Sequence, residues 1–204
     1  MNNEAVIIGY SGHAYVLIDI LMSNEYHVRG YCDVEAKSHN PYGLAYFGHE
    51  KDDAVLNLIK GKKVFVGIGD DATRARIFEY LFFKNINCPS VVYHISSVSA
   101  KATIGSGTVV MPGVVINSGA RIGKGVICNS SSVIEHECVV GDYSHIAPGA
   151  VLAGAVTVGI RTFIGANSVV KQGVKIGNNV IVGAGSVVIN DVSDGLTVYG
   201  NPAK

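Results

Sequence analysis

Apolar residues recur at every sixth position through the second half of this chain, without an interruption. A helix repeats about every 3.6 residues and a flat strand about every 2, so a period of six is typical of neither. Self-similarity at a fixed period indicates a solenoid whose turns stack on one another. All of these residues are branched aliphatics except Cys128, and buried cysteine packs as a small hydrophobe. The positions are Val98, Ile104, Val110, Ile116, Ile122, Cys128, Ile134, Val140, Ile146, Leu152, Val158, Ile164, Val170, Ile176, Val182 and Val188.

Glycine marks the same point of every third hexad, so three hexads make one coil of eighteen residues. Three short sides per coil, stacked in parallel, make a triangular β-prism. Glycine tolerates positive φ without steric strain, and Asn117 and Asn129, at the equivalent point of other sides, tolerate the same region. The pattern therefore predicts corners with positive φ at these positions. The glycines are Gly105, Gly123, Gly141, Gly159 and Gly177.

The chain before the hexads alternates strand-like and helix-like segments, which predicts a small parallel, Rossmann-like α/β domain over residues 1–95. The prism and a short tail follow over residues 96–204. Tyr42–Gly48 gives no clear pattern. The expected strands are Ala5–Gly9, Val28–Cys32, Val64–Ile68 and Ser90–Tyr93, and the expected helices are Ala14–Met22, Asp52–Ile59 and Ala72–Lys84.

Composition excludes several classes of partner. The 16 basic and 16 acidic side chains cancel, which argues against a nucleic-acid partner or an anionic membrane surface. We find no signal peptide and no segment of membrane-spanning length, so we expect a cytoplasmic protein without membrane insertion. The four cysteines lack CxxC spacing, which favours core thiols over a zinc site or disulfides.

His136 is the first candidate for chemistry, because it lies between two carboxylates in Glu135-His136-Glu137. A nearby carboxylate raises the basicity of an imidazole and orients its ring, as a general base requires. The alternative is a solvated turn of three charged groups. Neighbours on a strand point to opposite faces, so Glu137 reaches His136 only if a corner bends the chain there. His145 is a second candidate, although a single histidine of this kind is more often a surface residue.

Residues eighteen apart in the sequence lie above one another in successive coils, and this spacing places small residues in columns along the prism. A long, thin ligand could lie in such a groove and bind its backbone amides, although corners also favour small residues for packing alone. His136 lies six residues after Ser130, one side of the prism away. A site that uses both is therefore easier to build between two prisms. One column holds Asn129, Ala147, Gly165 and Gly183, and the next holds Ser130, Pro148, Ala166 and Ala184.

The loop Gly9–His13 joins an expected strand to an expected helix, where backbone N–H groups bind anions such as phosphate. It lacks the GxGxxG fingerprint of dinucleotide sites. Asp33 and Gly69 follow two further strands at the same sheet edge, where ligands favour parallel sheets. These features favour a nucleotide-type ligand, with an ordinary strand–turn–helix arrangement as the alternative.

Three motifs resemble those of one family: Ser11-Gly12-His13, the run Val133–Cys138 that reads VIEHEC, and Gly141–His145. The chain resembles the PglD/NeuD-like hexapeptide-repeat sugar acetyltransferases, and within them the UDP-4-amino-sugar N-acetyltransferases of the bacillosamine type. The resemblance implies a left-handed β-helix and direct acetyl transfer from acetyl-CoA to a 4-amino-4,6-dideoxy sugar on a nucleotide. It also implies no metal, and a homotrimer with active sites between subunits.

The resemblance further implies roles for individual residues. His136 would be the base, Glu137 would raise its basicity and Asn129 would shape the site. Acetyl-CoA would be bound by His145, Gly165, Ala166, Gly183 and Ala184, and the nucleotide sugar by Ser11, Gly12, His13, Asp33, Val34 and Gly69.

Three other functions fit the same fold. One is O-acetylation of a sialic acid or another sugar hydroxyl. Another is a non-catalytic solenoid that binds a sugar nucleotide or scaffolds partners. A metal-dependent hydratase is disfavoured, because it needs three convergent histidines and the prism offers only His136 and His145.

Overall fold

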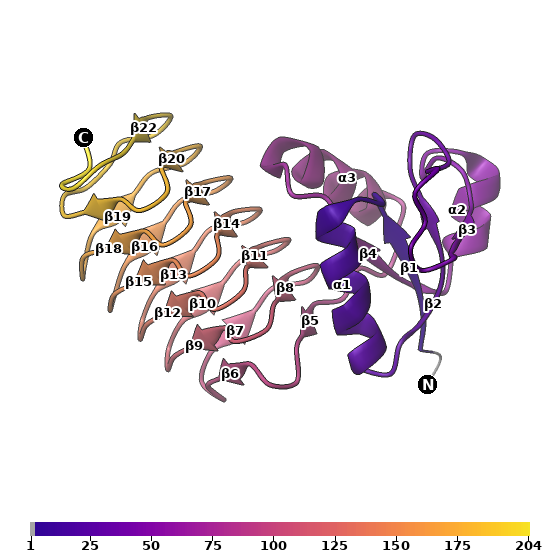
Figure 1. The fold of residues 1–204 in the computed structure, drawn as a ribbon, viewed down its shortest axis with the longest axis horizontal. Coiled ribbons are helices and arrows are strands. Elements are labelled where there is room, and N and C mark those ends of the chain that lie inside the picture. The colour runs from indigo at the N-terminus through magenta and orange to yellow at the C-terminus, as the bar shows by residue number, and fades with distance from the viewer. Residues whose placement is uncertain (1–2) are drawn as a thin grey trace. The chain divides into compact units, whose positions relative to one another are not determined.

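The computed structural model describes residues 3–204. The chain forms two compact units, Met1–Val91 and Val92–Lys204, whereas the sequence predicts a division between residues 95 and 96. Figure 1 shows the helices and parallel strands of the first unit and the stacked coils of the second. Within residues 3–204, no helix has the length and apolarity that crossing a bilayer requires.

The first unit is built on a four-stranded sheet in the order β3-β2-β1-β4, with every pair parallel. The wholly apolar run Ala5–Ile8 is buried in its central strand. Because the strands are parallel, the loops after β1, β2 and β4 meet at one edge of the sheet. The strands are β1 (Glu4–Ile8), β2 (His27–Cys32), β3 (Ala45–Tyr46) and β4 (Lys63–Val66), and the helices are α1 (Gly12–Ser23), α2 (Asp53–Ile59) and α3 (Asp71–Phe83).

One expected strand of this unit was wrong, and one segment that gave no clear pattern contains a strand. The unassigned segment Tyr42–Gly48 contains the edge strand β3. The expected strand Ser90–Tyr93 is reduced to β5 (Val91–Val92), which belongs to a sheet of the prism and not to the α/β sheet. The reason is the hexad itself, because Val92 lies six residues before Val98 and begins the repeat.

The second unit is a prism of three parallel sheets in which strand residues pair with residues eighteen positions on, as Cys128 does with Ile146, except in the last coil, where Ile181 pairs with Thr197 at a spacing of sixteen. The seven-stranded sheet contains β5, β8 (Val109–Val110), β11 (Ile127–Cys128), β14 (His145–Ile146), β17 (Phe163–Ile164), β20 (Ile181–Val182) and β22 (Thr197–Val198). The six-stranded sheet contains β6 (Ser97–Val98), β9 (Val115–Ile116), β12 (Val133–Ile134), β15 (Val151–Leu152), β18 (Val169–Val170) and β21 (Val187–Val188). The five-stranded sheet contains β7 (Thr103–Ile104), β10 (Arg121–Ile122), β13 (Val139–Val140), β16 (Thr157–Val158) and β19 (Lys175–Ile176).

Buried hydroxyl groups tie successive coils together. Thr162 Oγ1 donates to the carbonyl of Gly177 at 2.7 Å and accepts from the amide of Val180 at 3.2 Å. Ser144 does the same one coil earlier, donating to Gly159 and accepting from Thr162. The interior therefore combines a column of hexad side chains with hydrogen-bonded rungs.

The expectation of positive φ at the eighteen-spaced glycines was wrong. Positive φ occurs two positions later, for example at Gly107 and Gly125. The glycines are needed for a different reason: a Cβ on Gly105 would lie 2.5 Å from the carbonyl oxygen of Gly123 in the next coil. These positions are glycine because neighbouring backbones approach closely there.

Candidate active and nucleotide-binding sites

His136 and Glu137 form a pair at the corner that follows β12. Glu137 has φ +61°, so the chain bends between two side chains that would point apart on a straight strand. His136 Nδ1 lies 3.2 Å from Glu137 Oε2. The side chains are 53% and 73% exposed, respectively. The condition that the sequence set for this pair, a bend at Glu137, is therefore met.

Gly154 supports the His136 ring from the next coil. It stands eighteen residues after His136, and it is buried. A Cβ at this position would lie 2.5 Å from both Cε1 and Nε2 of the imidazole. Motif reading did not single out Gly154, but the eighteen-residue register would have found it.

Asn129 and His145 meet at a different corner, which follows strands of the seven-stranded sheet. Asn129 Oδ1 accepts the amide of Ser130 at 2.8 Å, which directs the Asn129 amino group to His145 Nε2 at 3.0 Å. That nitrogen is therefore an acceptor. The His145 ring also packs edge-on against Phe163, with centroids 5.1 Å apart. The structure brings Asn129 to His145 and not to His136.

The column of small residues leaves backbone donors open. Ala166 is half-buried and Ala184 is exposed. Within residues 3–204 the structure shows no acceptor for the N–H group of either alanine. Gly165 and Gly183 lie beside them, and a Cβ on Gly165 would meet Val182 O at 2.5 Å. The column thus offers two amides, one coil apart, to a ligand with spaced carbonyl groups.

Within one chain, His136 and this column lie at different corners of the prism. His136 follows β12 of the six-stranded sheet, whereas Ala166 and Ala184 follow β17 and β20 of the seven-stranded sheet.

The loop between β1 and α1 contains the other predicted motif. Ser11 is extended (φ −146°), makes no side-chain cap, and is exposed together with Gly12. Burial, reinforced by the charge of Arg74, lowers the pKa of His13 to about 4. His13 is therefore neutral near pH 7, and it can offer an anion a hydrogen bond but not a charge.

Asp33 orders this loop. Its carboxylate accepts the amides of Tyr10 at 2.9 Å and Val34 at 2.7 Å, and it pairs with Lys37 at 3.2 Å. The side chain of Val34 is exposed. Any ribose that binds Asp33 would add to bonds that the carboxylate already makes.

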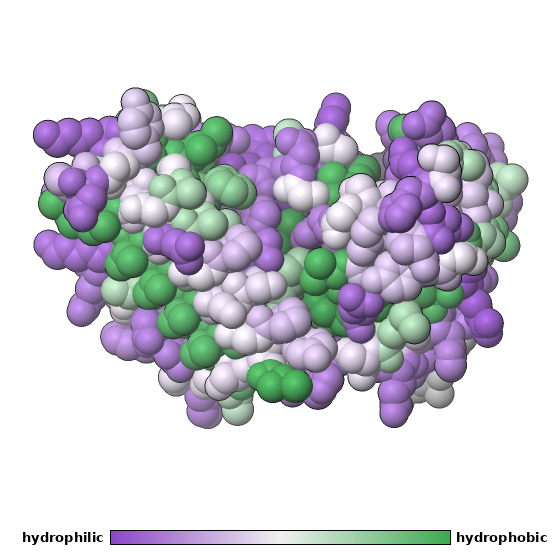
Figure 2. Space-filling model, viewed as in Figure 1, coloured by the Kyte–Doolittle hydropathy of each residue, from purple (hydrophilic) through white to green (hydrophobic). Residues whose placement is uncertain are grey.

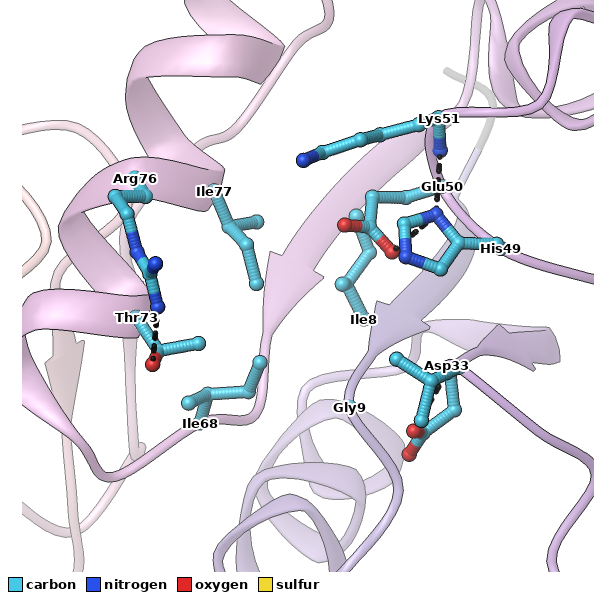
Figure 3. Close-up of a pocket in the computed structure, with 11 residues that line it drawn as sticks. Ile8, Gly9, Asp33, His49, Glu50, Lys51, Ile68, Thr73, Arg76 and Ile77 are labelled. Atoms are coloured by element: carbon cyan, nitrogen blue, oxygen red, sulfur yellow. Dashed lines mark hydrogen bonds and ion pairs between the residues drawn. The ribbon is translucent and has the colours of Figure 1, made fainter.

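A cavity of about 250 Å³ opens at the carboxyl edge of the α/β sheet (Figure 3). Two predicted residues, Asp33 and Val34, line it, whereas Ser11, Gly12, His13 and Gly69 do not. The remaining lining residues come from segments that only tertiary packing brings together, and of them only Gly9 lies in a loop that the sequence singled out. These residues are Ile8, Gly9, His49, Glu50, Lys51, Ile68, Thr73, Arg76 and Ile77.

Glu50 is a buried carboxylate of this cavity, with 6% of its surface exposed. Burial, together with the charges of Glu50 and Asp33, raises the pKa of the nearby Cys32 thiol to about 12. All four cysteines are buried and free, as the sequence predicted.

Comparisons with known proteins agree with this two-part architecture. The PglD N-terminal domain family matches residues 4–81, and a hexapeptide repeat of succinyl-transferase matches residues 155–189. GDP-perosamine N-acetyltransferase of Escherichia coli O157:H7 is 39% identical over 95 residues, which are 46% of this chain and 42% of that relative. The aligned region thus spans under half of the curated relative.

Two solved structures match nearly the whole chain. PerB from Caulobacter crescentus, in complex with CoA and GDP-perosamine, is 35% identical, with a TM-score of 0.91 over 98% of this chain and 96% of that one. The acetyltransferase domain of PglB from Neisseria gonorrhoeae FA1090, in complex with acetyl coenzyme A, is 29% identical, with a TM-score of 0.91 over 100% and 99%.

These matches confirm the expected fold class, a Rossmann-like α/β unit followed by a left-handed parallel β-helix. The fold and these matches together define a hexapeptide-repeat acyltransferase with an N-terminal α/β unit. The chain belongs to the PglD-like family of sugar acetyltransferases.

Proposed function

We propose that this protein transfers the acetyl group of acetyl-CoA to the 4-amino group of a nucleotide-linked 4-amino-4,6-dideoxy sugar. The resemblance of the sequence makes the UDP-linked form the expected one. The observation that carries the proposal is the exposed His136–Glu137 pair, joined at 3.2 Å on a corner of the prism. The names of the relatives support it, since both PerB and the curated relative are called N-acetyltransferases of perosamine.

His136 acts as the general base in this proposal. The Nδ1–H group of His136 donates a hydrogen bond to the Glu137 carboxylate, which leaves the Nε2 lone pair free to take a proton from the sugar amine as the amine attacks. The neutral amine nitrogen forms a bond to the thioester carbonyl carbon as His136 takes its proton, the C–S bond breaks, and the CoA thiolate leaves and takes that proton from the imidazolium. Backbone N–H groups stabilise the charge that develops on the carbonyl oxygen.

Acetyl-CoA supplies an activated acyl thioester when it is bound. The residues of the small-residue column fit its pantetheine arm, because the amides of Ala166 and Ala184 have no acceptor within the described chain. His145 borders the same corner and would contact the cofactor through its ring. No step of this mechanism requires a metal ion or a covalent acyl-enzyme.

The proposal includes a homotrimer with active sites between subunits. The separation of His136 from the column within one chain supports it. Exposed apolar side chains on the prism, such as Val169 and Ile181, offer surface for such packing. Figure 2 shows apolar side chains recurring from coil to coil on the visible face of this unit.

Release of free thiol from acetyl-CoA tests the activity. We expect release only with a nucleotide-linked 4-amino sugar, across a panel of UDP-, dTDP- and GDP-linked compounds. His136→Ala should lower kcat by about a hundredfold or more, because a general base is removed. His27→Ala, at an exposed histidine of β2, is the matched control. Absence of release with every amino sugar, or unchanged turnover in His136→Ala, contradicts the proposal.

A further inference from the structure

The cavity of the α/β unit contains a buried carboxylate that lacks a hydrogen-bond donor. Glu50 is 6% exposed, and its polar neighbour is His49, whose Nδ1 lies 3.5 Å from Glu50 Oε2. That nitrogen accepts the amide of Lys51 at 3.1 Å, so it has no proton to donate. Across residues 3–204 the structure therefore shows no donor to this carboxylate. Neither Glu50 oxygen is among the side-chain atoms of the described chain that are buried without a partner, so the carboxylate is accessible from the cavity and can accept from the N–H groups of a ligand.

The other lining residues and the volume of the cavity indicate what kind of ligand it can bind. Ile8, Ile68 and Ile77 supply apolar walls. Lys51 and Arg76 lie on opposite sides of the cavity, and the Arg76 guanidinium donates to Thr73 Oγ1 (Figure 3). The volume of about 250 Å³ lies below the usual range of about 300–1,000 Å³ for drug-sized ligands. The cavity therefore suits a single flat heterocycle that presents N–H donors to Glu50.

We infer that Glu50 binds the guanine base of a GDP-linked sugar. This inference rests on the proposed function and names the nucleotide of its substrate. The edge of guanine presents two adjacent donors, N1–H and the 2-amino group, which match the two oxygens of one carboxylate. The neighbouring O6 of guanine is an acceptor. Lys51 follows Glu50 in the sequence, and its ammonium group can donate a hydrogen bond to this oxygen.

Other bases fit this arrangement poorly. Uracil has one N–H between two carbonyl oxygens, so a carboxylate that accepts from it also meets an oxygen lone pair. Adenine places a ring lone pair beside its amino group. The buried carboxylate therefore selects guanine, and GDP replaces the UDP that the resemblance of the sequence suggested.

Calorimetric titration of the full chain with GDP, UDP and IDP tests the inference without any substitution. IDP has hypoxanthine in place of guanine and so lacks only the 2-amino group. We expect GDP to bind at least about a hundredfold more tightly than UDP. We expect IDP to bind about tenfold more weakly than GDP, because one charge-assisted hydrogen bond is lost.

Glu50→Gln tests the residue itself. It should weaken GDP binding by about tenfold or more, and it should bring the GDP-to-IDP ratio close to one, because an amide cannot accept both guanine donors. Glu79→Gln, at an exposed carboxylate of α3 outside the cavity, is the matched control and should change neither value. A general structural effect of the substitution would weaken GDP and IDP equally.

The outcomes separate this inference from the proposed function. A chain that acetylates a UDP-linked amino sugar and binds UDP as tightly as GDP overturns the guanine assignment, while acetyl transfer stands. Equal binding of GDP and IDP by the unaltered chain overturns it as well. A chain that discriminates GDP from IDP but releases no thiol with any amino sugar overturns the transferase and keeps the guanine site.

Discussion

At the scale of single residues, the His136 corner depends on two backbone features as much as on its ionisable groups. The positive φ of Glu137 brings the carboxylate to Nδ1. The missing side chain of Gly154 makes room for the ring one coil away. A site on a solenoid is thus set by residues of two successive coils.

Gly154→Ala should displace the imidazole and lower kcat by about tenfold or more, since small displacements of a catalytic group are costly. The free energy of unfolding should change by less than about 1 kcal/mol, because the half-exposed ring can swing aside. Turnover and chemical denaturation of the same preparation measure both quantities. In a His136→Ala background the substitution should have no further effect on turnover. A further loss there would contradict the proposal that Gly154 acts by making room for the His136 ring.

Sequence reasoning placed the His136–Glu137 pair correctly because its partners are adjacent and one corner joins them. It did not find Glu50, because the residues of that cavity come from β1, α3 and the loops after β2, β3 and β4. Only tertiary packing brings these segments together. His13 is similar: its neutrality depends on burial against Arg74, which sequence patterns do not encode.

At the scale of elements, each coil is held by backbone pairing and by hydroxyl rungs. Two-residue strands make few hydrogen bonds of their own, so the buried donors and acceptors at each corner need other partners. Thr162 satisfies a carbonyl and an amide of the next coil at once. This explains a polar side chain with no exposed surface inside an apolar prism.

Thr162→Val keeps the shape of the side chain and leaves Gly177 O and Val180 N without their partner. We expect a loss in the free energy of unfolding of about 1–3 kcal/mol for each orphaned group. Denaturant unfolding followed by circular dichroism checks this. Thr157→Val, at a half-buried position with no side-chain hydrogen bond in the described chain, should stay within about 0.5 kcal/mol. Equal effects of the two substitutions would contradict the proposal that the hydrogen bonds of the Thr162 hydroxyl stabilise the prism.

The period of six predicted the coils, their register and their inward side chains, because one rule governs all of them. It misassigned the positive φ, because two constraints favour glycine: a left-handed backbone and a close approach between coils. At Gly105 the close approach between coils is the constraint that requires glycine. The repeat also extends one hexad further toward the N-terminus, since Val92 of β5 lies six residues before Val98.

At the scale of the whole molecule, we propose that the active site combines corners from two copies of the prism. His136 and the column of Ala166 and Ala184 occupy corners of different sheets in one chain. A neighbouring subunit could bring the second corner to the first. The catalytic unit would then be the interface and not the chain.

Mixing two inactive variants tests this arrangement. His136→Ala lacks the base, and Ala166→Trp blocks the column. If sites are shared, mixed trimers should recover activity, with about a quarter of all sites intact after random assembly. Thiol release from verified mixed trimers is the measurement. No recovery would place the whole site within one chain.

The eighteen-residue register also spaces equivalent groups evenly along the axis of the prism. The amides of Ala166 and Ala184 stand one strand spacing apart, about 4.8 Å along the axis. Further contacts along the column can be added only in whole steps of that size, by whole coils. A one-residue insertion would move every later side chain to the wrong face. The length of ligand that such a groove selects would therefore change only in steps of one whole coil.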